Sequence, residues 1–472
     1  MKVRNPRSGL DDYEFNECPR EHLTAEAVRL RKAQVEWEEL GPNGRAKVLM
    51  RFADAIEVAM PAIASALTID TGRSAVSWIE VQACIANIRN WAVRGPELFA
   101  ALDRGPKAST TPGVQIVTEY SAFPLFGAIC PWNFPVILSH IDAVPALMAG
   151  SAALVKPSEV TPRFVEPMNE VLSQIPELPL AYVLGGPDVG EALIEEVDYV
   201  CFTGSTATGR KVAQAAAREL IPANLELGGK DPMIITASAD PQWAADIALR
   251  ASIVATGQAC QSIERVFVAR EIAEPFLSAL VAGAKGVELT YPDAASGHIG
   301  PFIFPDQAGK VQSHIDDAIA MGARILTGGQ IETLGGGQYL RPTVLTDVTC
   351  DMAVMREETF GPVIPVTVFD NIEAAIVQAN DTEYGLSAAV LAGSIDEAHQ
   401  IGLRLDAGAI SLQDGGLTSM VGDAANQSRK CSGLGPSRMG DMGMLRFLRE
   451  QAMIRQTVNA LPIAAYAEGQ AG

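Results

Sequence analysis

Short apolar stretches alternate with segments of helical pattern between residues 127 and 227, and this alternation constrains the possible folds more than any other feature. The stretches with the character of buried strands lie at 127–130, 152–155, 181–184, 199–202 and 224–227. Segments with helical spacing lie between them at 136–148, 161–172 and 205–219. Strands and helices that alternate in this way form a parallel sheet with helices on both faces. We therefore predict a Rossmann-like α/β domain.

The rest of the 472-residue chain is too long to share that domain's core. A second α/β pattern extends from about residue 230 to 440, with strands near 233–235, 265–268, 363–369 and 389–391. Residues 24–103 have helical spacing, and 114–120 alternate as a strand does. The glycine pair at 228–229 lies between the two α/β patterns, where we expect a hinge.

Composition limits the possible partners. The net charge of −20 would repel a polyanion, so we expect neither nucleic acid nor an anionic membrane as a partner. The N-terminus lacks the apolar segment of a secretory signal, and no uninterrupted apolar run reaches the length of a membrane span. The seven cysteines form no Cys-x-x-Cys pair and the five histidines lack metal-binding spacing, so no disulfide framework or metal is expected. These features favour a soluble, cytoplasmic enzyme.

Two predicted strands end in residues that suit a nucleotide. The turn at 203–205 follows a strand and opens a helix, whose first N–H groups can bind a phosphate. A Walker A loop is disfavoured because Arg210 and Lys211 occupy the positions of its lysine and its serine or threonine. Lys156 and Glu159 lie just beyond another strand, where a carboxylate suits ribose hydroxyls and repels a 2′-phosphate. An ordinary capped helix and a surface salt bridge are the alternatives.

Two further motifs suit covalent chemistry. Asn133 lies in a turn bounded by two prolines, where its amide can donate to a developing oxyanion or serve only packing. Cys260 has the most polar neighbourhood of the seven cysteines, and Gly257 and Ala259 allow the backbone to approach another group closely. The residues alone leave two interpretations of Cys260 open, a buried inert thiol or a nucleophile beside a ligand cleft.

The order of these motifs resembles the NAD(P)-dependent aldehyde dehydrogenase superfamily over about residues 15 to 460. Seven motifs carry the resemblance, at 131–135, 156–159, 202–205, 225–230, 257–260, 358–363 and 380–388. It implies an NAD-binding domain at 1–105 and 123–228 and a catalytic domain at 229–439. It also implies an oligomerisation arm and C-terminal segment at 106–122 and 440–466, in a homodimer or homotetramer.

The resemblance implies a role for each site residue. Cys260 would attack an aldehyde, Asn133 and the Cys260 N–H would hold the oxyanion, and Glu226 would activate water against the resulting thioester. The implied cofactor contacts are Trp132, Lys156, Ser158, Glu159, Phe202, Thr203, Gly204, Ser205, Leu227, Glu358 and Phe360. Glu159 favours NAD, with NADP possible.

Two departures affect the substrate. Many relatives carry a lysine at the position of Asp142, where it can relay protons, and the segment at 413–435 differs from the usual glycine-rich pattern. Apolar Ile137, Leu138 and Ile141 follow the Asn133 turn, and the entrance has no matching arginine, so a hydrophobic aliphatic or aromatic aldehyde is expected. The alternative for these side chains is that they simply face the core.

Two other functions are weighed against an acid-forming dehydrogenase. A semialdehyde dehydrogenase that transfers the acyl group to CoA generally lacks the base that Glu226 provides. A non-enzymatic protein with the same fold would need to have lost the nucleophile or the base, and both are present here. A cysteine protease is disfavoured because no histidine lies in a recognisable partner motif.

Overall fold

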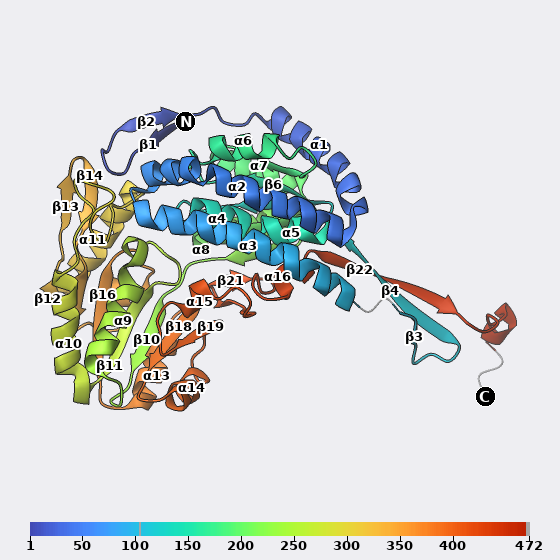
Figure 1. Cartoon of the computed structure of the whole chain (residues 1–472). Coiled ribbons are helices and arrows are strands. Elements are labelled where there is room, and N and C mark those ends of the chain that lie inside the picture. Colours follow the sequence, from blue (N-terminus) through green and yellow to red (C-terminus); the bar gives the residue numbers. More distant parts are fainter. Residues whose placement is uncertain (103–104, 469–472) are drawn as a thin grey trace.

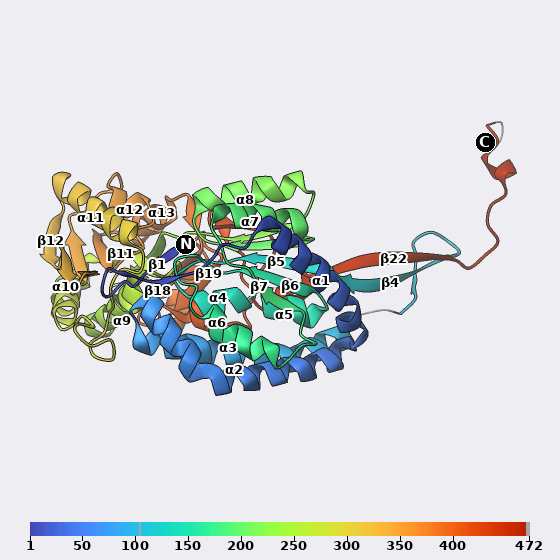
Figure 2. The ribbon, with the colours of Figure 1, turned by 90° about the horizontal axis from the view of Figure 1, so that it is seen from above.

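The computed structural model describes residues 1–102 and 105–468 of the chain. Figures 1 and 2 show a body made of two α/β units, from which a long pair of strands projects and carries the C-terminal end away.

The first sheet has six strands, in the order β21-β9-β8-β5-β6-β7. They are β5 (Leu125–Ile129), β6 (Ala152–Lys156), β7 (Leu180–Tyr182), β8 (Tyr199–Thr203), β9 (Ala223–Glu226) and β21 (Gly433–Leu434). Neighbours are parallel except β21 and β9, which are antiparallel. The five strands predicted between 127 and 227 are confirmed, and the sixth comes from the far end of the chain.

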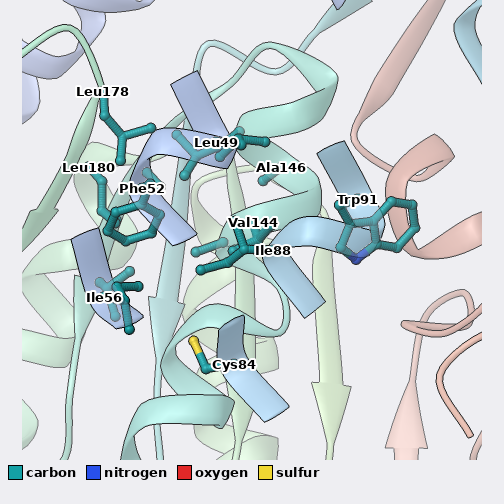
Figure 3. Packing of buried hydrophobic residues seen from close by; sticks show 14 of the residues in the cluster. Leu49, Phe52, Ile56, Cys84, Ile88, Trp91, Val144, Ala146, Leu178 and Leu180 are labelled. Atoms are coloured by element: carbon teal, nitrogen blue, oxygen red, sulfur yellow. The ribbon is translucent and has the colours of Figure 1, made fainter. Parts of the chain in front are cut away.

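Side chains of these strands alternate between two layers of helices. Phe126 and Ala128 pack in a core with α2 (Gly41–Thr71), α3 (Ser74–Ala101) and α6 (Val165–Ser173), part of which is drawn in Figure 3. Leu125, the residue before Phe126, points to the other side of the pleat and packs on the other face. That face is covered by α1 (Arg20–Glu39), α7 (Pro187–Glu196) and α8 (Thr206–Arg218).

By length and composition, α2 could cross a membrane, which the sequence did not lead us to expect. Leu49, Phe52 and Ile56 on this helix are fully buried in the same core, beside Ile88 of α3 (Figure 3). These side chains use one face of α2 for the core, and 33% of the most apolar stretch of the helix is buried.

The single helix predicted at 136–148 is wrong. Two helices occupy this segment, α4 (Pro135–His140) and α5 (Ala143–Ala149), with Ile141 and Asp142 between them. Pro145 explains the break, because in a continuous helix its ring would clash with the carbonyl of Ile141 and one hydrogen bond would be lost.

The second sheet has seven strands, in the order β12-β15-β16-β11-β10-β18-β19. They are β10 (Asp231–Ile235), β11 (Ile263–Ala269), β12 (Arg324–Thr327), β15 (Thr343–Thr346), β16 (Val363–Phe369), β18 (Ser387–Leu391) and β19 (Ala409–Leu412). One face packs against α9 (Pro241–Ile253) and α10 (Arg270–Lys285). The other packs against α11 (Pro305–Ala320), α12 (Ala353–Arg356), α13 (Ile372–Asn380) and α14 (Ile395–Gly402). The four strands predicted in this half are confirmed, and the chain crosses from the first sheet to the second at residues 227–230.

The projecting strands form a third, antiparallel sheet of β3 (Lys107–Ala108), β4 (Val114–Ala122) and β22 (Leu448–Gln456). β4 pairs with β22 from Ala122↔Leu448 to Val114↔Gln456. The strand predicted at 114–120 is therefore confirmed, and Figure 1 shows that it leaves the body.

Candidate active site

Cys260 lies on the wall of a cavity of about 360 Å³, which we call the Cys260 cavity. The wall combines residues of the first sheet's half, such as Ile137 and Glu226, with residues of the second half, such as Val254. Ser428 and Arg438, from the C-terminal part of the chain, complete it.

The turn before Cys260 has an unusual backbone. Ala255, Thr256 and Gly257 have φ angles of 56°, 63° and 66°, in the left-handed region. A Cβ on Gly257 would lie 2.4 Å from the carbonyl carbon and oxygen of Gly361, so only glycine fits. Such strain persists only where surrounding contacts enforce it, and it is common at functional sites.

The Cys260 thiol is partly accessible from the cavity. Burial raises its pKa to about 12, and the carboxyl groups of Glu358 and Asp231 act in the same direction. The thiol is therefore protonated at neutral pH, and a base must remove its proton before it can act as a nucleophile.

Asn133 is held next to the Cys260 turn. Its Nδ2 donates to the carbonyl of Gln258 over 3.0 Å, and its backbone carbonyl accepts from Arg73 Nη2. Asn133 itself lines no described cavity, but Phe134 after it lines the Cys260 cavity. One N–H of the amide is used by Gln258, which leaves the second for another acceptor.

Glu226 ends β9 and lines the Cys260 cavity. Ser428 Oγ donates to its Oε2 over 2.6 Å. Burial raises the pKa of Glu226, while Arg438 and the Ser428 hydrogen bond oppose that rise. A carboxyl group with a raised pKa on the wall of this cavity is suited to take up a proton.

A second cavity, of about 580 Å³, lies at the carboxyl ends of β5, β6 and β8, and we call it the Lys156 cavity. Of the eleven predicted cofactor residues, eight line it: Trp132, Lys156, Ser158, Glu159, Phe202, Thr203, Gly204 and Ser205. Lys156 Nζ lies 3.1 Å from Glu159 Oε2, and Ser205 Oγ caps α8 by accepting from Thr208 N. The strand ends thus gather residues from three separate motifs at one place.

The other three predicted cofactor residues are placed differently. Leu227 lines the Cys260 cavity, and Glu358 and Phe360 line neither of the two cavities. Phe360 nevertheless lies edge-on to Trp132, with ring centroids 5.5 Å apart. Glu358 Oε1 accepts from Gly229 N over 3.2 Å, and burial together with Glu264 raises its pKa to about 7.

Two arginines line the Cys260 cavity, which corrects the expectation of an entrance without arginine. Arg250 Nη2 donates to Asp414 Oδ2 over 2.6 Å, and Arg438 Nη2 donates to Asp142 Oδ2 over 2.5 Å. They reach the cavity from segments far from the Asn133 turn, so local sequence could not place them. Each of these arginines already forms an ion pair with an aspartate of the same chain.

Sequence reasoning also missed Arg73, Glu80 and Ser428. Glu80 Oε1 accepts from the N–H groups of Val136 and Ile137 at the start of α4. These residues lie outside the recognised motifs. For Ser428 and Arg438, the only signals in the sequence were the unusual residue Asp142 and the unusual segment at 413–435.

Known proteins share both the sequence and the fold. Residues 1–453 match the aldehyde dehydrogenase family. A Mycolicibacterium smegmatis protein named "Putative succinate-semialdehyde dehydrogenase (NADP+)" is 36% identical over 446 residues, 93% of this chain and 85% of its own length.

Two solved structures have the same fold. The Anabaena variabilis "Putative Aldehyde Dehydrogenase PutA" has a TM-score of 0.95 at 46% identity, covering 98% of both chains. Betaine aldehyde dehydrogenase from Staphylococcus aureus, solved with NAD+, has a TM-score of 0.91 at 28% identity, covering 98% of this chain and 92% of its own. The match over nearly the whole chain confirms the resemblance drawn from the seven motifs, and the chain belongs to the aldehyde dehydrogenase family, whose members are oxidoreductases acting on aldehydes.

Proposed function

We propose that this chain oxidises an uncharged hydrophobic aldehyde to the carboxylic acid with NAD(P)+, through a covalent intermediate on Cys260. The observation that carries the proposal is that Cys260 and Glu226 line one cavity, with the Asn133 amide held 3.0 Å from the Gln258 carbonyl two residues before the cysteine. Nucleophile, base and oxyanion donor come from three separate segments.

In the first stage, the Cys260 thiol releases its proton to solvent and the sulfur adds to the aldehyde carbon, so that Glu226 stays free for the second stage. The carbonyl oxygen becomes an oxyanion, which accepts hydrogen bonds from the free Asn133 N–H and the Cys260 backbone N–H. When bound, the nicotinamide supplies the hydride acceptor for the oxidation. The product on the enzyme is a thioester of Cys260.

In the second stage, Glu226 acts as a general base on water. Water adds to the thioester carbon, the C–S bond breaks, and the proton that Glu226 accepted returns to the sulfur. Ser428 supports this role because its hydroxyl fixes one carboxylate oxygen at 2.6 Å.

The Lys156 cavity fits a dinucleotide. The N-terminus of α8 offers N–H groups to a pyrophosphate, and Glu159 offers an acceptor to ribose hydroxyls. Leu227, Glu358 and Phe360 are proposed to complete the nicotinamide end. The pairing of Glu159 with Lys156 supports NAD over NADP, because a 2′-phosphate would lie beside a carboxylate.

The wall of the Cys260 cavity supports a hydrophobic substrate. Ile79, Phe134, Ile137, Val254 and Met420 line it, and both of its arginines are occupied by aspartates. A substrate carboxylate would lose its water without gaining a free cation among the described lining residues. This differs from what the name of the M. smegmatis relative would suggest.

A panel of aldehydes tests the proposal. With NAD+, hexanal and benzaldehyde should give kcat/KM about 10²-fold above that of succinate semialdehyde, the scale expected when a charge is buried unpaired. NADP+ should serve less well than NAD+, and the acid should form at the same rate with and without CoA. Preference for succinate semialdehyde would overturn the substrate class, and CoA-dependent acyl transfer would establish the alternative dehydrogenase.

The wider organisation is proposed on the same basis. We infer an NAD-binding domain at 1–105 and 123–228, a catalytic domain at 229–439, and an arm and C-terminal segment at 106–122 and 440–466. Met453, Ile454 and Val458 on the projecting strand and just after it expose apolar side chains, which supports a homodimer or homotetramer. A soluble, cytoplasmic location belongs to the same proposal.

A further inference from the structure

Behind Glu226 lies a buried cluster of three charged side chains, Asp142, Arg438 and Arg446. Their relative exposures are 2%, 7% and 6%. Arg438 Nη2 lies 2.5 Å from Asp142 Oδ2, and Arg446 Nη2 lies 2.5 Å from Asp142 Oδ1. One carboxylate therefore serves two guanidinium groups, which come from a segment about 300 residues away along the chain.

The cluster joins the two cavities. Arg438 lines the Cys260 cavity together with Glu226, and its Nη2 also donates to Thr203 Oγ1 over 2.7 Å. Thr203 lines the Lys156 cavity and is the direct partner of Glu226 in the register of β8 and β9. Arg438 Nη1 donates no hydrogen bond to any residue in the described part of the chain.

The charges of the cluster do not cancel. Two guanidinium groups and one carboxylate leave one positive charge, and Arg446 Nη1 is buried without a partner among the described residues. Burying three ions costs more than their mutual attraction usually returns, so stability alone is a weak reason for the cluster. An ionised Glu226 would bring the net charge of the four groups to zero.

The other groups around Glu226 do not change this balance. Ser428 is neutral, and burial raises the pKa of Cys201 on β8 and of Cys260 well above neutral, so both thiols are uncharged. Although burial raises the pKa of Asp142, the two arginines outweigh it and keep this group ionised. Among the charged neighbours of Glu226, only the arginines favour its carboxylate form.

We propose that Arg438 is a positioning residue for Glu226: anchored by Asp142 and Thr203, its fixed charge keeps the base ionised for attack of water on the thioester. This inference rests on the proposed function, since it assigns Glu226 to deacylation. Asp142 has the opposite effect on Glu226 from Arg438, because its negative charge favours the protonated form of the base.

The experiment follows deacylation alone. Cys260 is acylated with p-nitrophenyl acetate, excess ester is removed, and loss of the acetyl mass is followed by intact-protein mass spectrometry between pH 5 and 9. The rate should fall on the acid side as Glu226 becomes protonated. Arg438→Met should move this acid limb up by about one pH unit, and Asp142→Asn should move it down, because the two substitutions change the local charge in opposite directions.

Two variants serve as controls. Arg438→Lys keeps the charge and should return the limb to within about 0.3 pH unit of wild type, even if its rate falls. Arg446→Met removes a charge that acts less strongly on Glu226 and should give a smaller upward shift than Arg438→Met. If Arg438→Met fails to fold, the test uses Asp142→Asn and Arg446→Met, which should move the acid limb of the deacylation rate in opposite directions.

Unmoved limbs, or limbs that move in the same direction in all variants, would overturn the role of Arg438 and leave a structural cluster. That result is distinct from failure of the proposed function. In the latter case, wild-type Cys260 would not be acylated, or Glu226→Gln would deacylate as fast as wild type.

Discussion

At the scale of single residues, the site combines a thiol that is poor as a nucleophile with a carboxyl group that is good as a base. Burial raises the pKa of Cys260 to about 12 and also raises the pKa of Glu226. A raised pKa makes Glu226 a stronger base, yet it must be ionised to act at neutral pH. The buried positive charge of Arg438 satisfies both needs, since it limits the rise without removing it.

The residues that the sequence could predict are those within short motifs. Cys260, Asn133 and Glu226 each lie in a local pattern whose chemistry is readable, and the structure brings them to one region. Arg438 and Ser428 could not be predicted, because their importance depends on a contact with residues 200 to 300 positions earlier in the chain. Asp142 was visible as a departure, but its two arginine partners were not.

At the scale of elements, the segment at 413–435 acquires a structural explanation. Its strand β21 pairs with β9, with Gly433 directly opposite Glu226. A Cβ on Gly433 would lie 2.6 Å from Ser428 Cβ and 2.7 Å from the Leu225 carbonyl oxygen. The unusual segment therefore forms the edge of the sheet beside the proposed base.

Gly433→Ala should slow deacylation about tenfold, because the displaced Ser428 would no longer hold the Glu226 carboxylate. Mass spectrometry of the acetyl-enzyme measures this rate. Ser428→Ala should have an effect of similar size. Gly422→Ala is the matched control, since a Cβ there meets nothing within 4 Å and the rate should stay unchanged. A Gly433→Ala enzyme that deacylates like wild type would argue against this route.

Whether a strand or helix could be predicted from the sequence depended on its length and its burial. Strands flanked by helices were found because a strand buried on both faces is a continuous apolar run. The break between α4 and α5 needed attention to Pro145, and β21 has only two residues, too few to show any periodicity. Short edge strands of this kind are defined by their partner rather than by their own sequence.

At the scale of the whole molecule, the two α/β units supply different parts of one site, and the projecting sheet lies apart from it (Figure 2). In the described chain, β22 pairs only with β4, so its other edge is open. Ile454 on this strand is 72% exposed. An open strand edge with an exposed apolar side chain is a surface on which another chain can pair.

Light scattering at micromolar concentration should therefore report a dimer or a tetramer. Ile454→Glu should shift the protein to a smaller species, because a charge would be buried in the contact. Arg455→Glu is the comparison, and it should weaken assembly less because position 455 already carries a charged side chain. A wild-type monomer under these conditions would contradict the proposed role of the arm.

The most direct test of the account is to trap the thioester. Glu226→Gln, mixed with NAD+ and hexanal, should form NADH in a single burst of one equivalent per Cys260. The acyl mass should then stay on Cys260, with hydrolysis slowed by about 10²–10⁴-fold. Peptide mapping locates the adduct, and Cys260→Ala should give neither burst nor adduct. Continuous turnover by Glu226→Gln at the wild-type rate, with no acyl group on Cys260, would contradict the central claim.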